Sequence, residues 1–497
     1  MILDTTGDSE LLRRVPSGIP GLDTILHGGF LHGGSYLVTG PPGSGKTVFG
    51  NQACFSHVGA GGRTVYVTVL TETHARMLWH LRSLSFFNPQ VIGDSLYYVS
   101  GYTALEESGL SGLLDLLLRV IRTQRATLIV LDGLETVRSA APSDLLLKRF
   151  LQDLHVYAES VGCTTLLLTP QYGQQPHLVH EMVDGLIQLG DELTGARAIR
   201  ELVVPKFRGS DYLRGRHFFQ ISSDGITVYP RIEALLAHPA LVTGEQRTRL
   251  PLGVSRLDEM LQGGLLSSST TLLLGAPGSG KTMLGLHFLA EGARHEERGM
   301  YFGFNETPPR LLEKAQGIGL DLERPVHNGT IEIIWQPLLE EVFDALAQRL
   351  LESVHRHKPR RLVVDGLDSL LYSAIYPDRA ARFVSALTNE LRGLDVTTLF
   401  SVGTSTLFGP EIAVSLPSAG TELDNIIFLR YVELRSQLHR LMSILKVRES
   451  AYDPAIREFQ ISEQGIAMDA TFATAEAILT GGGLARLHDS SLHEDRP

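Results

Sequence analysis

The sequence predicts an α/β fold of two tandem domains, each a mostly parallel sheet flanked by helices. Three observations predict it. The chain of 497 residues is too long for one hydrophobic core, a thirty-residue passage occurs twice, and apolar strand-like runs alternate with helical stretches in both halves. A repeat this long indicates a duplicated domain. We expect a first domain over 1–235, a linker over 236–249, a second domain over 250–470 and a flexible, glycine-containing tail over 471–497.

The composition is that of an ordinary globular protein, with 43% hydrophobic and 20% charged residues. The net charge of −11 disfavours a surface built mainly to hold nucleic acid, and the short basic run at 356–361 is expected on a solvated face. Cys54 and Cys163 are the only cysteines and form no CxxC pair, so we expect neither disulfides nor a cysteine metal site. No stretch has the features of an export signal or a membrane span. We therefore expect a cytoplasmic protein without membrane association.

The repeated passage covers residues 21–50 and 256–285, of which fifteen of thirty aligned positions are identical. Each copy contains a glycine-rich loop, GPPGSGKT at 40–47 and GAPGSGKT at 275–282, between an apolar run and a helical stretch. This is the pattern of a phosphate-binding loop. Its glycines let backbone N–H groups approach phosphate oxygens, and the following helix adds its positive N-terminus. Two copies in register make a chance glycine-rich turn a poor explanation.

The loops predict binding of ATP with Mg²⁺. We expect Lys46 and Lys281 to neutralise the β- and γ-phosphates, and Thr47 and Thr282 to place a hydroxyl on Mg²⁺. The candidate ATP-binding residues are Gly40, Pro41, Pro42, Gly43, Ser44, Gly45, Lys46 and Thr47 in the first copy, and Gly275, Ala276, Pro277, Gly278, Ser279, Gly280, Lys281 and Thr282 in the second.

Acidic residues follow two apolar runs in each copy. Asp132 and Asp365 end runs that should lie beside the loop strand, and we expect them to help hold Mg²⁺. The alternative is an ordinary aspartate in a turn. Glu72 and Glu306 end the strand after each loop helix, where a carboxylate can take a proton from a water that attacks the γ-phosphate. The alternative is an acid at a helix start, where the helix dipole favours it.

The order of these motifs resembles the RecA superfamily and, within it, the KaiC family of circadian clock ATPases. The resemblance rests on the GLDxxLxGG stretch of the first copy, the two loops, the strand-end acids and the closing Lys-x-Arg hairpins, and it is closest over 424–465. It covers nearly the whole chain. It implies two RecA-like P-loop NTPase domains in a two-tier homo-hexamer, with ATP bound between neighbouring subunits.

The resemblance also gives the closing hairpins a role. Lys206 and Arg208, and likewise Lys446 and Arg448, match family positions that reach the γ-phosphate held by the adjacent subunit. A cation supplied in this way stabilises charge on the transferring phosphoryl group. The alternative is a basic hairpin at a sheet edge with solvated charges.

The chain departs from the family pattern in two places. Thr71 and Asn305 stand where the family has the first of two glutamates, so one carboxylate remains in each pair. In the family a Ser-Thr pair of the second domain accepts phosphate; here Gly420 takes the serine position and Thr421 the threonine position. Thr421 is therefore the candidate phosphorylation site for a serine/threonine autokinase activity. The alternative is a residue that merely forms a turn.

Three functions remain open at this point. The first is an ATP-hydrolysing oligomeric switch that recruits signalling proteins. The second is a DNA-dependent ATPase of the RecA/RadA type, which needs a basic channel or aromatic loops that contact single strands. The third is a scaffold in which ATP serves only for assembly. We expect the first, with nucleic acid disfavoured by the negative charge.

Overall fold

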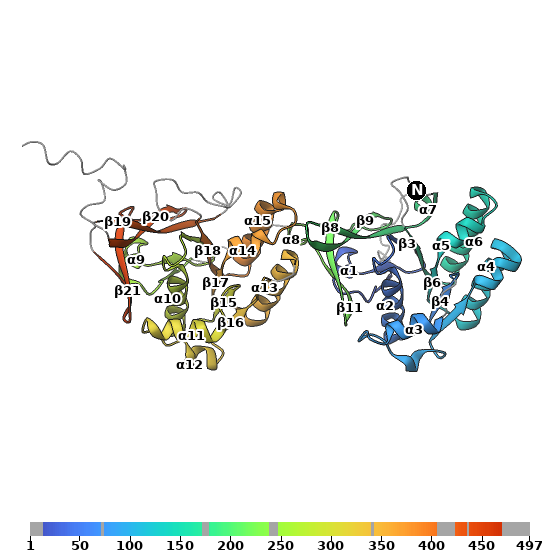
Figure 1. Ribbon diagram of the computed structural model, residues 1–497, viewed down its shortest axis with the longest axis horizontal. Coiled ribbons are helices and arrows are strands. Elements are labelled where there is room, and N and C mark those ends of the chain that lie inside the picture. The colour runs from blue at the N-terminus through green and yellow to red at the C-terminus, as the bar shows by residue number, and fades with distance from the viewer. Residues whose placement is uncertain are drawn as a thin grey trace, which may run out of the picture. The chain divides into compact units, whose positions relative to one another are not determined.

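The computed structural model describes residues 13–70, 74–170, 178–237, 247–338, 342–404, 423–434 and 437–469. The chain divides into two compact units between Leu235 and Leu236, and each unit contains a nine-stranded sheet and a separate two-stranded ribbon (Figure 1). The predicted fold class, two tandem domains with mostly parallel sheets and flanking helices, is confirmed. The expected tail over 471–497 and most of the expected linker lie outside the described residues.

The first sheet is parallel on one side and antiparallel on the other. Its strands lie in the order β11 (Gly225–Tyr229), β10 (Arg216–Ser222), β9 (Arg197–Phe207), β8 (Gly185–Thr194), β3 (Ser35–Gly40), β7 (Thr164–Pro170), β6 (Leu128–Asp132), β4 (Thr64–Thr68) and β5 (Leu96–Ser100). The strands from β8 to β5 run parallel, and β9, β10 and β11 form an antiparallel ladder. The ribbon pairs β1 (Arg14–Val15) with β2 (Phe30–Leu31).

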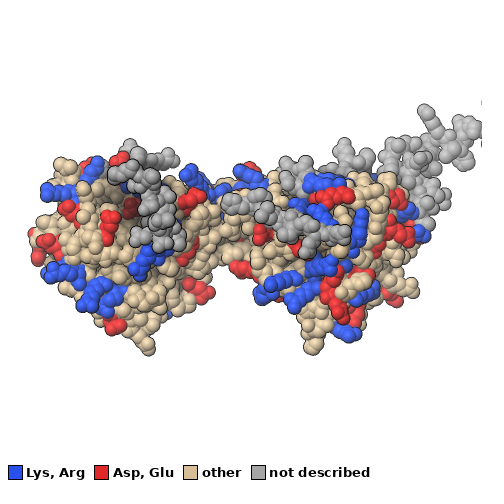
Figure 2. All heavy atoms as spheres, turned by 180° about the vertical axis from the view of Figure 1, so that it is seen from behind, with Lys and Arg blue, Asp and Glu red and all other residues tan. Residues whose placement is uncertain are grey.

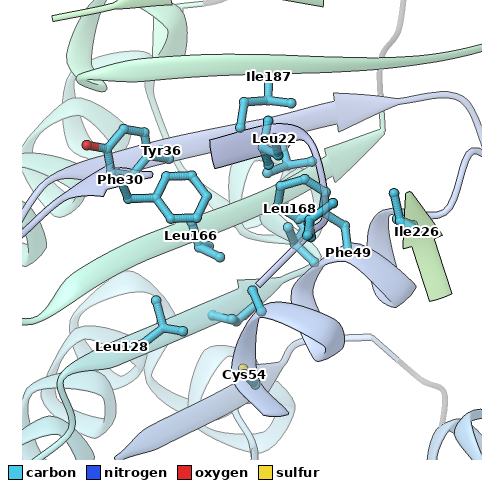
Figure 3. Close-up of a cluster of buried hydrophobic side chains, with 14 of the residues drawn as sticks. Leu22, Phe30, Tyr36, Phe49, Cys54, Leu128, Leu166, Leu168, Ile187 and Ile226 are labelled. Carbon is cyan, nitrogen blue, oxygen red and sulfur yellow. The ribbon is translucent and has the colours of Figure 1, made fainter. Parts of the chain in front are cut away.

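Helices cover both faces of this sheet. The helices are α1 (Leu22–Ile25), α2 (Lys46–Gly59), α3 (His74–Leu81), a 3₁₀ turn (Pro89–Val91), α4 (Tyr102–Gln124), α5 (Leu134–Ala140), α6 (Asp144–Ser160), α7 (Leu178–Met182) and α8 (Ile232–Leu235). Leu128 and Val130 of β6 belong to the same core cluster as Phe49 of α2. Figure 3 labels Leu128 and Phe49 in this cluster. Ile129 and Leu131 belong to the cluster on the face of α4, α5 and α6. Burial on both faces explains the continuous apolar runs of the sequence.

The second unit repeats the arrangement. Its sheet has the order β16 (Ile331–Trp335), β15 (Gly299–Gly303), β17 (Arg361–Asp365), β18 (Thr397–Gly403), β14 (Thr270–Gly275), β19 (Asn425–Leu434), β20 (Gln437–Val447), β21 (Arg457–Ser462) and β22 (Gly465–Met468), beside a ribbon of β12 (Arg249–Leu250) and β13 (Leu265–Leu266). Its helices are α9 (Ser255–Met260), α10 (Lys281–Arg294), α11 (Pro308–Gly317), α12 (Glu323–His327), α13 (Phe343–His357), α14 (Leu367–Tyr372), a 3₁₀ turn (Pro377–Arg379) and α15 (Ala380–Gly393). In both units a central strand, β3 or β14, leads into a glycine-rich loop.

The basic run at 356–361 does not lie wholly on a solvated face, which corrects the prediction for Arg361. This residue begins β17 and is 1% exposed. Its guanidinium donates to Glu297 Oε2 at 2.5 Å and to the carbonyls of Pro251 and Phe288 at 2.6 and 3.0 Å. It also lies 4.7 Å from the centre of the Phe288 ring. Burial is tolerated because an ion pair, two backbone acceptors and an aromatic face replace water around the charge.

Each loop helix is tied to the last strand of its sheet by one buried polar side chain. In the first unit Gln52 of α2 accepts a hydrogen bond from Ile226 N at 2.7 Å. In the second unit His287 of α10 accepts one from Ile466 N through Nε2 at 3.1 Å. Both side chains stand six residues after the loop lysine, so they are the same position of the repeat. The amide acceptor of Gln52 does not titrate, whereas the imidazole acceptor of His287 is lost on protonation.

This difference predicts a pH effect on the second unit. Burial lowers the pKa of His287 below its ordinary 6.5; Arg294 adds to this, while the Gly253 carbonyl and Glu291 oppose it. The folded state therefore binds fewer protons than the unfolded state. Neutral His287 therefore contributes its full share to the free energy of unfolding above about pH 6.5. This contribution is lost as the pH falls from there through the lower pKa of His287 in the folded state. Relative to His287→Gln, the wild type should lose free energy of unfolding on acidification.

The measurement is urea unfolding at several pH values in a Trp79→Phe background, which leaves Trp335 of the second unit as the sole tryptophan reporter. Burial raises the pKa of Asp258 to about 6. Protonation of Asp258 on acidification therefore raises the free energy of unfolding, opposite to the effect of His287. The difference between wild type and His287→Gln is therefore the informative quantity. Parallel pH curves for the two proteins would contradict the prediction.

Candidate functional site

The first glycine-rich loop joins β3 to α2 at the carboxyl end of the sheet. Gly43 and Gly45 have φ angles of 83° and 97°, which favour glycine. A Cβ on Gly43 would meet no atom within 4 Å, so this backbone faces open space. Because α2 begins at Lys46, directly after Gly45, its first N–H groups are available to a ligand. The loop therefore presents backbone donors to an anion.

The second loop has the same backbone but a different neighbour. Gly278 and Gly280 have φ angles of 77° and 109°, and α10 begins at Lys281. The hydroxyl of Tyr431 on β19 donates to the Gly278 carbonyl at 2.5 Å. The repeat places Asp191 of β8 at the position of Tyr431, where it pairs with Arg200 at 3.4 Å. Tyr431 thus contacts the second loop directly, whereas its counterpart Asp191 pairs with Arg200.

The loop lysines lie across their own loops. Each donates from Nζ to the carbonyls of the first two loop residues, at 2.8 and 2.9 Å for Lys46 and at 2.6 and 3.0 Å for Lys281. Burial lowers the pKa of both lysines, while nearby aspartates oppose the shift. Ser44 Oγ and Ser279 Oγ are buried and form no hydrogen bond with any described residue. Ammonium groups, free backbone donors and unsatisfied buried hydroxyls together fit a phosphate chain.

The structure brings each loop threonine to the predicted aspartate. Thr47 Oγ1 lies 3.4 Å from Asp132 Oδ2, and Thr282 Oγ1 donates to Asp365 Oδ2 at 2.8 Å. Both aspartates end a strand, β6 or β17, and are directed to the carboxyl edge of the sheet where the loop lies. Within the described ranges no group of three His, Cys, Asp or Glu side chains could hold a metal. A hydroxyl and a carboxylate fit Mg²⁺ that takes its other ligands from phosphate and water.

Two tyrosines that the sequence analysis missed complete this pair. Tyr66 of β4 donates to Asp132 Oδ2 at 2.8 Å, and Tyr301 of β15 donates to Asp365 Oδ2 at 2.6 Å. Burial is the main cause that raises the pKa of both tyrosines, and the neighbouring aspartate adds to it. Both phenols therefore stay protonated donors. The repeat carried a signal for them, because tyrosine recurs at the same place of both strands.

Of the two predicted proton acceptors, only Glu306 lies within the described residues. It precedes α11, and its Oε1 accepts a hydrogen bond from Lys314 Nζ within an ion pair. Its Oε2 is buried and has no hydrogen-bond partner among the described residues. One oxygen is thus engaged by a cation and the other is available as an acceptor. The position before a helix also fits the alternative of an acid at a helix start.

The spacing between the strand and the helix that follows it is one residue longer in the first copy than in the second. Thr68 pairs with Asp132, and Gly303 pairs with Asp365, so Thr68 and Gly303 are matching positions. Glu306 is the third residue after Gly303, whereas Glu72 is the fourth residue after Thr68. Glu72 itself lies outside the described residues, as does Thr421. Counted from the helices the two glutamates match, since each stands two residues before its helix begins, at His74 for α3 and at Pro308 for α11. Their equivalence stays a prediction.

The Lys-x-Arg hairpin of the first unit lies at the opposite end of the strands from the loop. Lys206 of β9 pairs with Leu186 of β8, which pairs with Leu37 of β3. Arg208 lies further from the loop still, because its N–H donates to the Asp184 carbonyl at 2.8 Å, before β8 begins. At about 3.3 Å per residue this places the pair roughly 10–16 Å from the carboxyl end of β3. Both cations are therefore remote from their own loop.

The second hairpin has the same placement. Lys446 pairs with Ile426, which pairs with Leu272 in the first half of β14. Lys446 Nζ donates to the Leu423 carbonyl at 2.6 Å, and Arg448 lies 3.5 Å from Asp424 Oδ1. In the first unit Lys206 and Arg208 donate to carbonyls of α7. In each unit the loop, its threonine and the aspartate thus lie together at the carboxyl end of the central strands. The Lys-x-Arg pair of the same unit lies toward the other end of those strands.

Surface charge is mixed on the face shown in Figure 2, where Lys and Arg lie among Asp and Glu on both units. None of the described helices is long and apolar enough to cross a membrane. Neither observation points to a second kind of site, so the two glycine-rich loops are the candidate functional sites of the described residues.

The fold and these loops define a class. A phosphate-binding loop between a central parallel strand and a helix, with an aspartate at the end of a nearby strand, defines a P-loop NTPase. Here the sheet order is that of RecA-like domains, in two consecutive copies.

Comparison with known proteins then gives the family. A sequence model of the family described as "ATPase: KaiC" matches residues 15–233 and 250–471. The circadian clock oscillator protein KaiC of Synechococcus elongatus is 28% identical over 490 residues, which cover 96% of this chain and 93% of that protein. The circadian clock oscillator protein KaiC 1 of Synechocystis is 27% identical over 482 residues, covering 95% and 92%. The chain belongs to the KaiC family of ATPases, which confirms the resemblance drawn from the motifs.

Proposed function

We propose that this chain is an ATP-driven signalling switch that binds ATP with Mg²⁺ at both loops and hydrolyses it within a homo-hexamer. One observation carries the proposal: in each unit the loop threonine contacts a strand-end aspartate at the carboxyl end of the central strands, beside a loop that carries the lysine. Signalling proteins would bind the assembly in one of its nucleotide-dependent conformations.

The chain's own groups divide the work at each site. Lys46 and Lys281 bind phosphate oxygens, and the loop N–H groups orient them. Thr47 with Asp132, and Thr282 with Asp365, hold the metal. Bound MgATP supplies the reactive phosphoryl group and the metal charge. Glu306 has a buried acceptor oxygen that bonds to no described residue and can take a proton from water, and Glu72 is proposed for the same role in the first site.

The hairpin cations are proposed to act on the neighbouring subunit. Strand register holds Lys206, Arg208, Lys446 and Arg448 at the end of the sheet remote from their own loops. A ring brings the far end of one subunit against the loop end of the next. Such a site is complete only between two subunits, which supports an oligomer rather than a monomeric enzyme.

Autophosphorylation at Thr421 is proposed as a second activity of the second site. The family pattern and the hydroxyl at 421 support it. Asn305 weakens it, because the family's first glutamate is absent there. Experiment must therefore separate phosphate released to water from phosphate kept on the protein.

Replacement of the loop lysines tests nucleotide binding. Lys46→Ala and Lys281→Ala should each weaken ATP binding at one site by roughly 10- to 150-fold, since a lost charge-assisted hydrogen bond is worth about 1.5–3 kcal/mol. The double variant should lose turnover. Lys148→Ala on α6 is the control and should match wild type. Calorimetric titration with ATP and Mg²⁺ gives the affinities, and unchanged binding in the double variant would contradict the proposal.

Incubation with γ-labelled ATP separates the functions. Released phosphate that depends on both lysines supports the hydrolytic switch, and protein-bound label that vanishes in Thr421→Ala establishes the autokinase. Neither product, with ATP still needed for hexamers, would favour the scaffold. Single-stranded DNA that binds and stimulates turnover in a salt-dependent way would favour the RecA/RadA-type ATPase.

A further inference from the structure

The aspartate of the second site is held by three hydroxyl groups from three different elements. Asp365 Oδ2 accepts from Thr282 of α10 at 2.8 Å and from Tyr301 of β15 at 2.6 Å. Asp365 Oδ1 accepts from the hydroxyl of Ser401 on β18. A carboxylate offers about two acceptor positions on each oxygen. The two bonds to Oδ2 fill that oxygen, and the bond from Ser401 leaves one position on Oδ1.

Ser401 can orient the carboxylate because its hydroxyl accepts one hydrogen bond and donates another. Its Oγ accepts a hydrogen bond from Gly366 N at 2.9 Å, at the start of α14. With that N–H on a lone pair, the hydroxyl proton is directed to Asp365 Oδ1. Ser401 is 3% exposed, so water does not compete for these bonds. A serine hydroxyl thus fixes the rotation of the side chain that ends β17.

The first unit lacks this serine. Strand register pairs Asp365 with Ser401, and it pairs Asp132 with Leu168. Leu168 is fully buried in the apolar core beneath α2 and offers only its carbonyl, which accepts from Gly133 N at 3.3 Å. The threonine contact is also looser there, at 3.4 Å against 2.8 Å. The two sites therefore differ in the groups that contact their aspartates, and the serine contact belongs to the second site.

We propose that Ser401 is a positioning residue for the metal of the second site. It holds the Asp365 carboxylate with one oxygen position open, so that Mg²⁺ is retained with the nucleotide at a lower metal concentration than the same site would need without the serine hydroxyl. The inference rests on the proposed function, since it assigns a task within the same nucleotide site. Outer groups that orient metal-binding side chains are worth about 10- to 100-fold in metal affinity.

The experiment measures ADP binding to the full chain as Mg²⁺ is varied, in a Lys46→Ala background that weakens the first site. ADP is the probe because its binding needs no turnover. The variants are Ser401→Ala and Ser401→Thr, which keeps the hydroxyl. Thr398→Val is the matched control: this neighbour on β18 has a buried Oγ1 that bonds to no described residue. Thermal unfolding without Mg²⁺ is recorded for each protein.

Ser401→Ala should raise the Mg²⁺ concentration for half-maximal ADP binding by about 10- to 100-fold. Ser401→Thr should restore it, and Thr398→Val should leave it unchanged. A midpoint that does not move in Ser401→Ala overturns the inference, even where the melting temperature falls, because that pattern marks a purely structural serine. Absence of ADP binding in the parent protein at every Mg²⁺ concentration overturns the proposed function and the inference with it.

Discussion

Replacement of Arg448 by alanine is expected to lower ATP turnover at the second site by about 10³- to 10⁵-fold while nucleotide binding is retained. This is the range for loss of an arginine that stabilises charge on a transferring phosphoryl group. The retained binding follows from placement, because Arg448 lies at the strand end remote from its own loop. Turnover is measured as released phosphate in a Lys46→Ala background, with Arg256→Ala on α9 as the control.

Mixing variants tests whether the arginine acts on a neighbour. Subunits with Lys281→Ala keep Arg448, and subunits with Arg448→Ala keep an intact loop. If each site is shared between subunits, the mixture should regain turnover that neither protein has alone. A mixture that stays inactive, although calorimetry shows ATP bound, would contradict action between subunits and return the hairpins to a solvated-edge role.

The second large effect is expected on stability. Asp344→Ala should lower the free energy of unfolding of the second unit by about 3–5 kcal/mol, because it removes a carboxylate that forms two hydrogen bonds with a buried guanidinium. Asp344 is fully buried and Arg379 is 4% exposed. Two hydrogen bonds of 2.8 and 2.9 Å join them, and Arg379 lies 4.6 Å from the centre of the Phe343 ring.

Urea unfolding followed by Trp335 fluorescence, again with Trp79→Phe, measures this loss. The control is Asp378→Ala, whose pair with Arg382 is exposed and 3.7 Å apart, so a change of at most about 1 kcal/mol is expected. Asp344→Leu combined with Arg379→Met should recover much of the stability, since apolar replacement of a whole buried pair is often neutral. A loss below 1 kcal/mol in Asp344→Ala alone would refute the assigned importance of the pair.

Much of each site could be predicted because local sequence determines it. The glycines of the loop dictate its backbone, and the residue that follows a buried strand must lie at the sheet edge, so Thr47 and Asp132 could be brought together from the sequence. The tandem α/β fold followed from the repeat and from strands buried on both faces. Tyr66 and Tyr301 could have been found by reading the repeat for polar atoms inside apolar strands.

Other features depend on which strands become neighbours, and the sequence alone does not show this. Ser401 looks like one polar residue in an apolar run until β18 pairs with β17. Glu72 lies outside the described residues, and its match to Glu306 stays a prediction, because the first copy has one more residue between strand and helix than the second. Arg361 stands in a basic run that resembles a solvated segment, and tertiary acceptors override that pattern.

In the proposed ring with shared sites, the separation of loop and hairpin along one sheet has a genetic consequence. With Lys206 or Arg208 altered, a chain would damage the site of its neighbour, and with its loop altered it would damage its own. A chain carrying both defects would spoil two sites of every ring it enters. A minority of such chains, expressed beside the wild type, should therefore suppress activity out of proportion to their number.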